Sequence, residues 1–201
     1  MSTITSGTDM ENIKRHETII YGGAFNPPTL AHIAILQACI EYARPRGADV
    51  WVMPSGVRTD KPQPIDAERR LAYIGAMIDD VDTTGVTTTV YTKELERVIP
   101  VETFDTVLEI DEEFPDREFT WVFGADSTET MADWHEGEWL LENLSMLVLE
   151  REGYKINPLA KRAVALTIPH MTISSTDVRN GLAEGRDVSE LVSPRILSLI
   201  V

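Results

Sequence analysis

The chain has 201 residues, 43% of them hydrophobic and 25% charged, which predicts one globular domain and excludes a largely disordered or fibrous protein. Acidic residues outnumber basic ones by 33 to 18, and the resulting net charge of -15 repels a nucleic-acid backbone and argues against a DNA or RNA partner. No apolar run approaches the roughly 20 residues of a membrane span, so a membrane location is not expected either.

The first 17 residues are polar and mixed in charge, and they lack the apolar stretch of a secretory signal. We therefore expect a flexible polar leader over residues 1–17, a single domain over residues 18–201, and a cytoplasmic protein. Cys39 is the only cysteine, which excludes an intrachain disulfide and a cysteine-rich metal site. Its place on the apolar side of a predicted helix indicates a buried, small hydrophobic side chain.

Short β-rich runs alternate with amphipathic segments along the rest of the chain. Most of the runs are continuously apolar, as in strands that are buried on both faces of a sheet. The expected strands lie near Thr18–Tyr21, Ala48–Met53, Val86–Tyr91, Phe119–Phe123, Met146–Leu149 and Ala165–Ile168, and the expected helices over His32–Ala43, Asp66–Ile78, Thr103–Glu113 and Thr176–Glu184. This alternation predicts an α/β fold with a single Rossmann-like, doubly wound domain, whose mainly parallel sheet is flanked by helices on both faces.

The turn after the first predicted strand, YGGAFNPPTLAH (21–32), is both bare and rigid. Its two adjacent glycines allow a sharp turn without Cβ atoms in the way of a ligand, and its two adjacent prolines stiffen the loop. Thr29 and His32 lie three residues apart in the first helical turn, where free amides and the helix dipole favour an anion. One interpretation is that the hydroxyl and the imidazole donate to phosphate oxygens. The other is a purely structural glycine–proline turn into a helix.

A second cluster of hydroxyl groups begins another predicted helix near the C-terminus. Ser174 with Asp177 three residues later forms a capping box, which stabilises a helix without any ligand. Capping uses one hydroxyl, however, and leaves those of Ser175 and Thr176 spare. Arg179 lies one turn later on the same face, so two hydroxyls and a guanidinium converge in a way that suits a polyphosphate.

These two stretches together resemble the signatures of the nucleotidylyltransferase superfamily. Residues 29–32, TLAH, resemble a turn that ends in (His/Thr)-x-Gly-His, with Ala31 in place of the glycine, and residues 173–179, ISSTDVR, match Ile-Ser-Ser-Thr-x-x-Arg completely. Within the superfamily, residues 22–28, GGAFNPP, are similar to the Gly-Gly-x-Phe-(Asp/Asn)-Pro-Pro of the bacterial nicotinate mononucleotide adenylyltransferases. The order Gly-Ala-Asp (124–126), Trp134 and then Leu-Leu is also typical of that family. The resemblance extends from about Thr18 to the end of the chain.

The resemblance assigns residues to both substrates of such an enzyme. Those expected to bind ATP are Gly22, Gly23, Ala24, Phe25, Thr29, His32, Lys61, Gly124, Asp126, Ile173, Ser174, Ser175, Thr176 and Arg179. Those expected to bind the pyridine mononucleotide are Asn26, Thr103, Trp134 and Arg151. His32, Thr29 and Arg179 are expected to be catalytic because they would contact the reacting phosphates. Mg²⁺ is expected as a cofactor held mainly by the ATP phosphates and water, so no protein metal ligand is assigned.

The activity that the resemblance implies is transfer of AMP from ATP to nicotinate mononucleotide, which forms the dinucleotide and pyrophosphate in NAD biosynthesis. Residues 100–103, PVET, stand where the family has Pro-Ser-Tyr-Thr, and Glu102 leaves open a preference for the nicotinamide form. Two alternatives remain at this point. One is a nucleotidylyltransferase for another phosphomonoester such as phosphopantetheine, and the other is a nucleotide-binding protein with impaired catalysis. The sequence also leaves the oligomeric state open.

Overall fold

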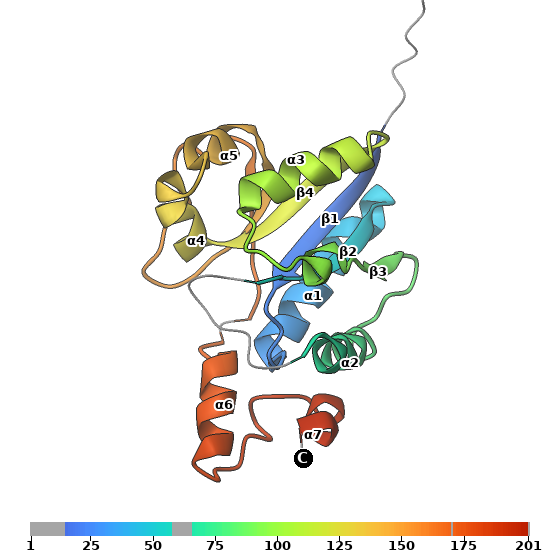
Figure 1. Cartoon of the computed structure of the whole chain (residues 1–201), viewed down its shortest axis with the longest axis vertical. Helices are drawn as coiled ribbons and strands as arrows, with labels where there is room; N and C mark the ends of the chain where they lie inside the picture. Colours follow the sequence, from blue (N-terminus) through green and yellow to red (C-terminus); the bar gives the residue numbers. More distant parts are fainter. Residues whose placement is uncertain (1–14, 58–65, 170, 201) are drawn as a thin grey trace, which may run out of the picture.

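Six parallel strands form a sheet in the order β3-β2-β1-β4-β5-β6 (Figure 1). The computed structural model describes residues 15–57, 66–169 and 171–200. The strands are β1 (His16–Gly23), β2 (Asp49–Pro54), β3 (Thr88–Val90), β4 (Arg117–Gly124), β5 (Ser145–Leu149) and β6 (Ala163–Leu166). Because the strand order reverses at β1, the carboxyl ends of β1 and β4 flank the crevice in which open α/β sheets usually bind their ligands.

Helices cover both faces of this sheet. They are α1 (Leu30–Ala43), α2 (Ala67–Ile78), α3 (Thr103–Glu113), α4 (Ala125–Thr130), α5 (Gly137–Asn143), α6 (Ser175–Ala183) and α7 (Pro194–Ile200), with short 3-10 helices η1 (Arg44–Arg46), η2 (Lys93–Glu96) and η3 (Met131–Asp133). In Figure 1, α3, α4 and α5 lie on one side of the strands, and α1 and α2 lie on the other. No helix in these described ranges is both long enough and apolar enough to cross a membrane.

The core has two layers because successive strand residues point to opposite faces of the sheet. Ile19 of β1 packs with α1, α2, α6 and α7 in one apolar cluster. Its neighbour Ile20 belongs to the second cluster, which includes residues of α3, α4 and α5. Cys39 is completely buried in the first cluster, as expected from its position on α1.

The observed architecture confirms the α/β class, the parallel sheet and the helices on both faces. All five strand pairings are parallel. The last strand lies at Ala163–Leu166, two residues before its expected position, and the first helix begins at Leu30 rather than at His32. The sequence pattern does not predict α4, α5 or α7, since helices of seven residues or fewer do not complete a periodic apolar pattern.

The start of the first strand differs from the expected boundary between the leader and the domain. Strand β1 begins at His16, so the last two residues of the expected leader pair with β4 through the register of His16 with Arg117 and Glu17 with Glu118. Residues 1–14 lie outside the described ranges. The helix expected from Asp66 begins at Ala67, with Asp66 as its N-cap residue.

Candidate active site

A cavity of about 850 Å³ lies at the carboxyl ends of the strands. Its lining comes from the ends of β1, β2, β4 and β5, from the first turns of α1 and α3, and from α4 and η3. Among the residues predicted for the site, the cavity is lined by Gly22, Gly23, His32, Thr103, Gly124, Asp126, Trp134 and Arg151. The sheet therefore brings together segments that are more than 100 residues apart in the sequence, at the crevice expected from the strand order.

Three side-chain hydrogen bonds to backbone carbonyls hold the loop between β1 and α1. The Ala24 carbonyl accepts from Arg70 at 2.9 Å, the Asn26 carbonyl from Arg179 at 2.8 Å, and the Pro27 carbonyl from the Ser175 hydroxyl at 2.8 Å. Phe25, between these residues, is buried and has a positive φ of 47°, a conformation that costs energy in a residue with a Cβ. The three donors come from α2 and α6, so tertiary contacts fix the shape of this loop.

The two adjacent glycines of this loop differ in what surrounds them. A Cβ at Gly23 would lie 2.9 Å from the buried ring of Phe25, so a side chain there would have to displace that ring. A Cβ at Gly22 would lie no closer than 3.8 Å to another atom of the chain, which is an ordinary contact. Gly22 lines the cavity, so its lack of a side chain leaves room for a ligand rather than for the protein.

His32 presents one ring nitrogen to its own helix start. The Thr29 amide donates to its Nδ1 at 3.1 Å, and the Thr29 hydroxyl lies 2.8 Å from the same nitrogen. Because a backbone amide can only donate, Nδ1 is an acceptor and the neutral ring carries its proton on Nε2. Burial, together with the positive charge of Arg151, lowers the pKa of His32 to about 4. At neutral pH the ring is therefore an uncharged donor whose Nε2 has no hydrogen-bond partner among the described residues.

The ISSTDVR segment supports the loop rather than the cavity wall. Ser174 accepts from the Asp177 amide at 3.2 Å, and Asp177 accepts in return from the Ser174 amide at 2.8 Å, which confirms the capping box. The two hydroxyls expected to be spare are both engaged. That of Ser175 donates to the loop, and that of Thr176 accepts from Arg179 at 3.0 Å. Neither these residues nor Ile173 belong to the cavity lining.

Gly124 ends β4 and Asp126 lies in the first turn of α4, and both line the cavity. A Cβ at Gly124 would lie 2.2 Å from Asp126 Oδ1, so only glycine allows the carboxylate its position. Asp126 Oδ2 accepts from Arg151 at 3.3 Å, whereas Oδ1 is buried and has no hydrogen-bond partner in residues 15–57, 66–169 and 171–200. An unpaired buried carboxylate oxygen at a cavity wall is typical of a position that meets a ligand.

The expected mononucleotide residues do not all reach the cavity. Trp134 is half-buried on the cavity wall and packs edge-on against Phe123, with 6.2 Å between ring centroids. Thr103 begins α3 and also lines the cavity. Asn26 is a buried residue of the loop and does not line the cavity, and its Oδ1 has no hydrogen-bond partner within the described part of the chain. Lys61, which is expected to bind ATP rather than the mononucleotide, lies outside the described residues.

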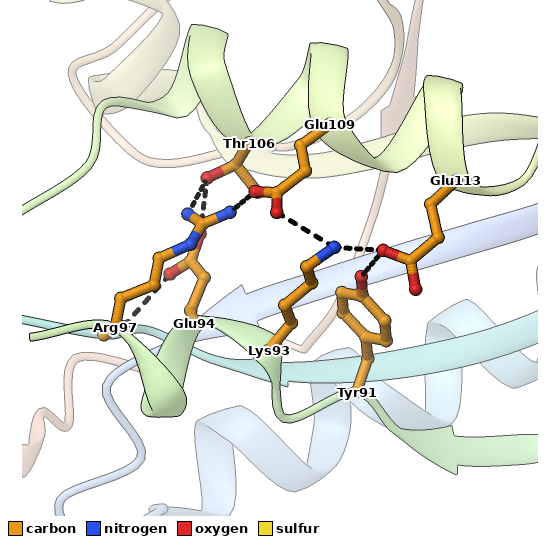
Figure 2. Close-up of polar contacts among 8 residues, drawn as sticks. Tyr91, Lys93, Glu94, Arg97, Thr106, Glu109 and Glu113 are labelled. Atoms are coloured by element: carbon orange, nitrogen blue, oxygen red, sulfur yellow. Dashed lines mark hydrogen bonds and ion pairs between the residues drawn. The ribbon is translucent and has the colours of Figure 1, made fainter.

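Among the polar residues at or near the cavity that the sequence prediction does not name, four bridge separate elements, and Figure 2 shows three of them. Glu94 accepts from the Gly56 amide at 3.0 Å and from the Thr106 hydroxyl at 2.9 Å, and Arg97 donates to the same hydroxyl at 2.8 Å (Figure 2). These contacts join η2, α3 and the loop after β2. No periodic pattern marks Glu94, Arg97 or Thr106, because their partners come from other elements.

The fourth is Arg70, and a signal for it exists in the sequence. It lies on the buried face of α2 with Tyr73, Ile74 and Met77, at helical spacings of three, four and seven residues. A charged residue on the apolar face of a predicted helix is unusual and indicates a specific partner. No group of three or more His, Cys, Asp or Glu side chains that could hold a metal occurs among the described residues.

Comparisons with known proteins identify the family. The cytidylyltransferase-like family model matches residues 20–181. A probable nicotinate-nucleotide adenylyltransferase of Exiguobacterium sibiricum is 30% identical over 183 residues, which cover 90% of this chain and 94% of the relative. One of the same name from Streptococcus pyogenes serotype M3 is 30% identical over 189 residues, 92% of this chain and 86% of the relative.

Solved structures show the same fold. Plasmodium falciparum nicotinic acid mononucleotide adenylyltransferase complexed with NaAD superposes with a TM-score of 0.77 at 23% identity, over 92% of this chain and 94% of that one. Its complex with APC gives a TM-score of 0.73 at 21% identity, with the same coverage of both chains. By its sequence match over most of its length, this chain belongs to the cytidylyltransferase-like family and, within it, to the nicotinate-nucleotide adenylyltransferases.

Proposed function

We propose that this chain transfers AMP from ATP to nicotinate mononucleotide and releases pyrophosphate, as a step of NAD biosynthesis. The observation that carries the proposal is the pairing, across one cavity, of the neutral His32 donor with the Gly124–Asp126 wall and Trp134. The names of the curated relatives, and the NaAD in the structure of the Plasmodium falciparum enzyme, support the same assignment.

The reaction needs no nucleophilic side chain. An oxygen of the mononucleotide phosphate attacks the α-phosphorus of ATP in line, the new oxygen–phosphorus bond forms, and the bond from the α-phosphorus to the bridging oxygen of pyrophosphate breaks. The protein then has to position two anions and to stabilise charge on the transferring group. In this proposal, Nε2 of His32 donates to the α-phosphate, and Thr29 holds the ring in the tautomer that makes this donation available.

The rest of the ATP site follows the loop and the helix that supports it. In this proposal, the peptide amides of Gly22, Gly23, Ala24 and Phe25 donate to the phosphates. Gly22 and Gly23 line the cavity, as do Gly124 and Asp126, which would contact the nucleotide. Ser174, Ser175, Thr176 and Arg179, with Ile173 before them, hold the β- and γ-phosphates. Because Ser175 and Arg179 bond the loop carbonyls in this structure, their phosphate contacts require either a second donor on Arg179 or an exchange of partner on binding. Lys61 is proposed to approach the same phosphates.

In this proposal, the mononucleotide lies against the part of the cavity wall that α3 and η3 form. Trp134 offers an indole face for stacking on the pyridine ring, and Thr103 and Arg151 supply polar contacts. Asn26 belongs to the loop that is proposed to bind the phosphates. It contributes through its Oδ1, which has no hydrogen-bond partner among the described residues.

Mg²⁺ fits this site as an ion carried by phosphate. It would be held by ATP oxygens and water and would neutralise charge on the transferring phosphates. The buried Oδ1 of Asp126, which has no partner among the described residues, is a cavity-wall group of suitable chemistry for it. The proposed partners are thus small molecules, ATP and a pyridine mononucleotide, and the proposed location is the cytoplasm.

Pyrophosphate release tests the function. The protein is incubated with ATP, Mg²⁺ and one of nicotinate mononucleotide, nicotinamide mononucleotide or phosphopantetheine, with His32→Ala as the control for contaminating activity. Release with nicotinate mononucleotide is expected. Faster release with the nicotinamide form would show a preference for that form. Release with phosphopantetheine alone would replace the proposed acceptor, and no release with any acceptor would identify a nucleotide-binding protein without turnover.

A further inference from the structure

Arg70 is almost completely buried, with 3% of its surface exposed, on the face of α2 that packs in the core. Among the described residues it forms no ion pair with a carboxylate, although the charge of Glu94 acts on it from a distance. Burying a charge without a paired counter-charge costs several kcal/mol. A residue retained at that cost is expected to do something that an apolar side chain of similar size would not.

The guanidinium of Arg70 joins two loops at the ends of neighbouring strands. Its Nε donates to the Ala24 carbonyl at 2.9 Å, in the loop after β1, and its Nη2 donates to the Ser55 carbonyl at 2.6 Å, in the loop after β2. The Ser55 amide in turn donates to the Gly23 carbonyl at 2.8 Å. The two loops are therefore tied at two points, of which only the guanidinium comes from a side chain.

The contact to Ala24 also sets the direction of the next amide. The peptide bond between Ala24 and Phe25 is trans, so its carbonyl and its amide point in opposite directions. With the carbonyl directed at Arg70, the amide of Phe25 is directed away from it, and that amide has no acceptor among the residues that the structure describes. The positive φ of Phe25 shows that this orientation is held against a local preference.

We propose that Arg70 is a positioning residue for nucleotide binding, whose two-point bridge from Ala24 to Ser55 presents the Phe25 amide to a phosphate of ATP. The proposal rests on the proposed function only in taking ATP as the ligand. Two-point bridging needs the planar fork of a guanidinium, because an ammonium group is a compact point donor on a different stem. Arg70 is thus distinguished from a residue that merely supplies positive charge.

Arg70→Lys keeps the charge and removes the fork. Since a displacement of about 1 Å in a positioning group costs up to about 10²-fold, kcat/KM for ATP should fall by about 10 to 10²-fold in this variant. The matched control is Arg69→Lys, which changes the preceding, exposed arginine of the same helix. Thermal melting of both variants accompanies the kinetics. A guanidinium salt at low, non-denaturing concentration should restore part of the turnover that Arg70→Ala loses, and it should leave the turnover of Arg69→Lys unchanged.

Three results would overturn the proposal. They are wild-type kcat/KM in Arg70→Lys, an equal loss in Arg69→Lys, and a loss in Arg70→Lys that disappears when activity is expressed per folded molecule. A measurement on the unmodified protein covers the case in which the variants do not fold: ATP should slow hydrogen exchange at the Phe25 amide, and unchanged exchange in the presence of bound ATP would refute the proposed contact. Failure of the proposed function looks different, because the wild-type protein would then bind ATP and protect this amide without turning over any mononucleotide.

Discussion

Replacing His32 with asparagine should reduce the loss of folding stability that this protein shows when the pH falls. The asparagine Oδ1 can accept from the Thr29 amide as Nδ1 does, but the side chain does not titrate. Comparison of the two proteins therefore isolates the protonation of one ring. All other acidic and basic groups are common to both and cancel in the difference.

The expected size follows from the depressed pKa. In the unfolded chain the ring takes up a proton as the pH falls through 6.5, whereas in the folded protein it does so only near pH 4. Between these values the unfolded state binds more protons, so the folded protein loses stability as the pH falls. From pH 7 to pH 5 the linkage relation gives a loss of about 2 kcal/mol for the wild type, beyond any loss shown by His32→Asn. Because His32 is only half-buried, this figure is an upper value.

Urea denaturation of both proteins at pH 7 and at pH 5 measures the difference. Equal losses of the free energy of unfolding in the two proteins would show that the ring is not held in its neutral, Nδ1-accepting form, and the catalytic role built on Nε2 would fall with it. Kinetics provide the second arm. His32→Ala should lower kcat by about 10² to 10³-fold, the usual cost of losing one transition-state donor. Wild-type kcat should not rise as the pH falls from 7.5 to 5.5, because the imidazolium is not the active form.

Three further substitutions probe the two walls and the supporting helix. Gly124→Ala should lower kcat/KM at least about 10-fold in steady-state assays and change the melting temperature only slightly. The new Cβ would lie 2.2 Å from the present position of Asp126 Oδ1 and would therefore displace the carboxylate. Unchanged kinetics would show that this carboxylate takes no part in the reaction. Trp134→Ala should raise KM for the mononucleotide and leave KM for ATP unchanged, and equal increases in both would make the indole a core residue. Ser174→Ala should cost about 1 kcal/mol in denaturant unfolding through loss of the helix cap, and a loss within error would mean that the capping box contributes nothing.

The sequence was most informative where a side chain's role depends on its own segment. The apolar runs place every strand within a few residues, and Ser174 caps its helix as its spacing from Asp177 predicts. The Thr29–His32 pair is likewise local, although only the structure shows which nitrogen faces inward. Glu94 and Arg97 act through residues of other elements, so their part in the site depends on how η2 and α3 pack together.

The sequence identifies the ISSTDVR motif, but it does not show what the side chains of this motif contact. The Ser175 hydroxyl and the Arg179 guanidinium do lie on one face, as their helical spacing predicts. They donate to the Pro27 and Asn26 carbonyls of the loop rather than facing open space. Helical periodicity predicts which side chains share a face, and it contains no information about what that face meets. The contact partner lies about 150 residues away in the chain and is fixed only when α6 packs beside the loop.

A strongly acidic chain that binds two anionic substrates has to create a favourable potential locally, and under the proposed function oriented dipoles contribute to it. Arg70, Arg151 and Arg179 are each bound to a carbonyl or a carboxylate of the protein, so their charges are partly committed before any ligand arrives. In the loop after β1, Arg70 and Arg179 bind carbonyl oxygens, those of Ala24 and Asn26, so these oxygens point toward the arginines and are not available to repel a phosphate. Under the proposed function, the Phe25 amide and the neutral imidazole of His32 complement Arg179 and Lys61 at the phosphates. Neither donor has an acceptor among the described residues, and neither needs a counter-charge or a reorganisation when charge develops on the transferring group. The net charge of -15 is compatible with this arrangement because dipoles at contact distance act over a few ångströms, whereas the field of distant carboxylates is screened by salt within about 10 Å.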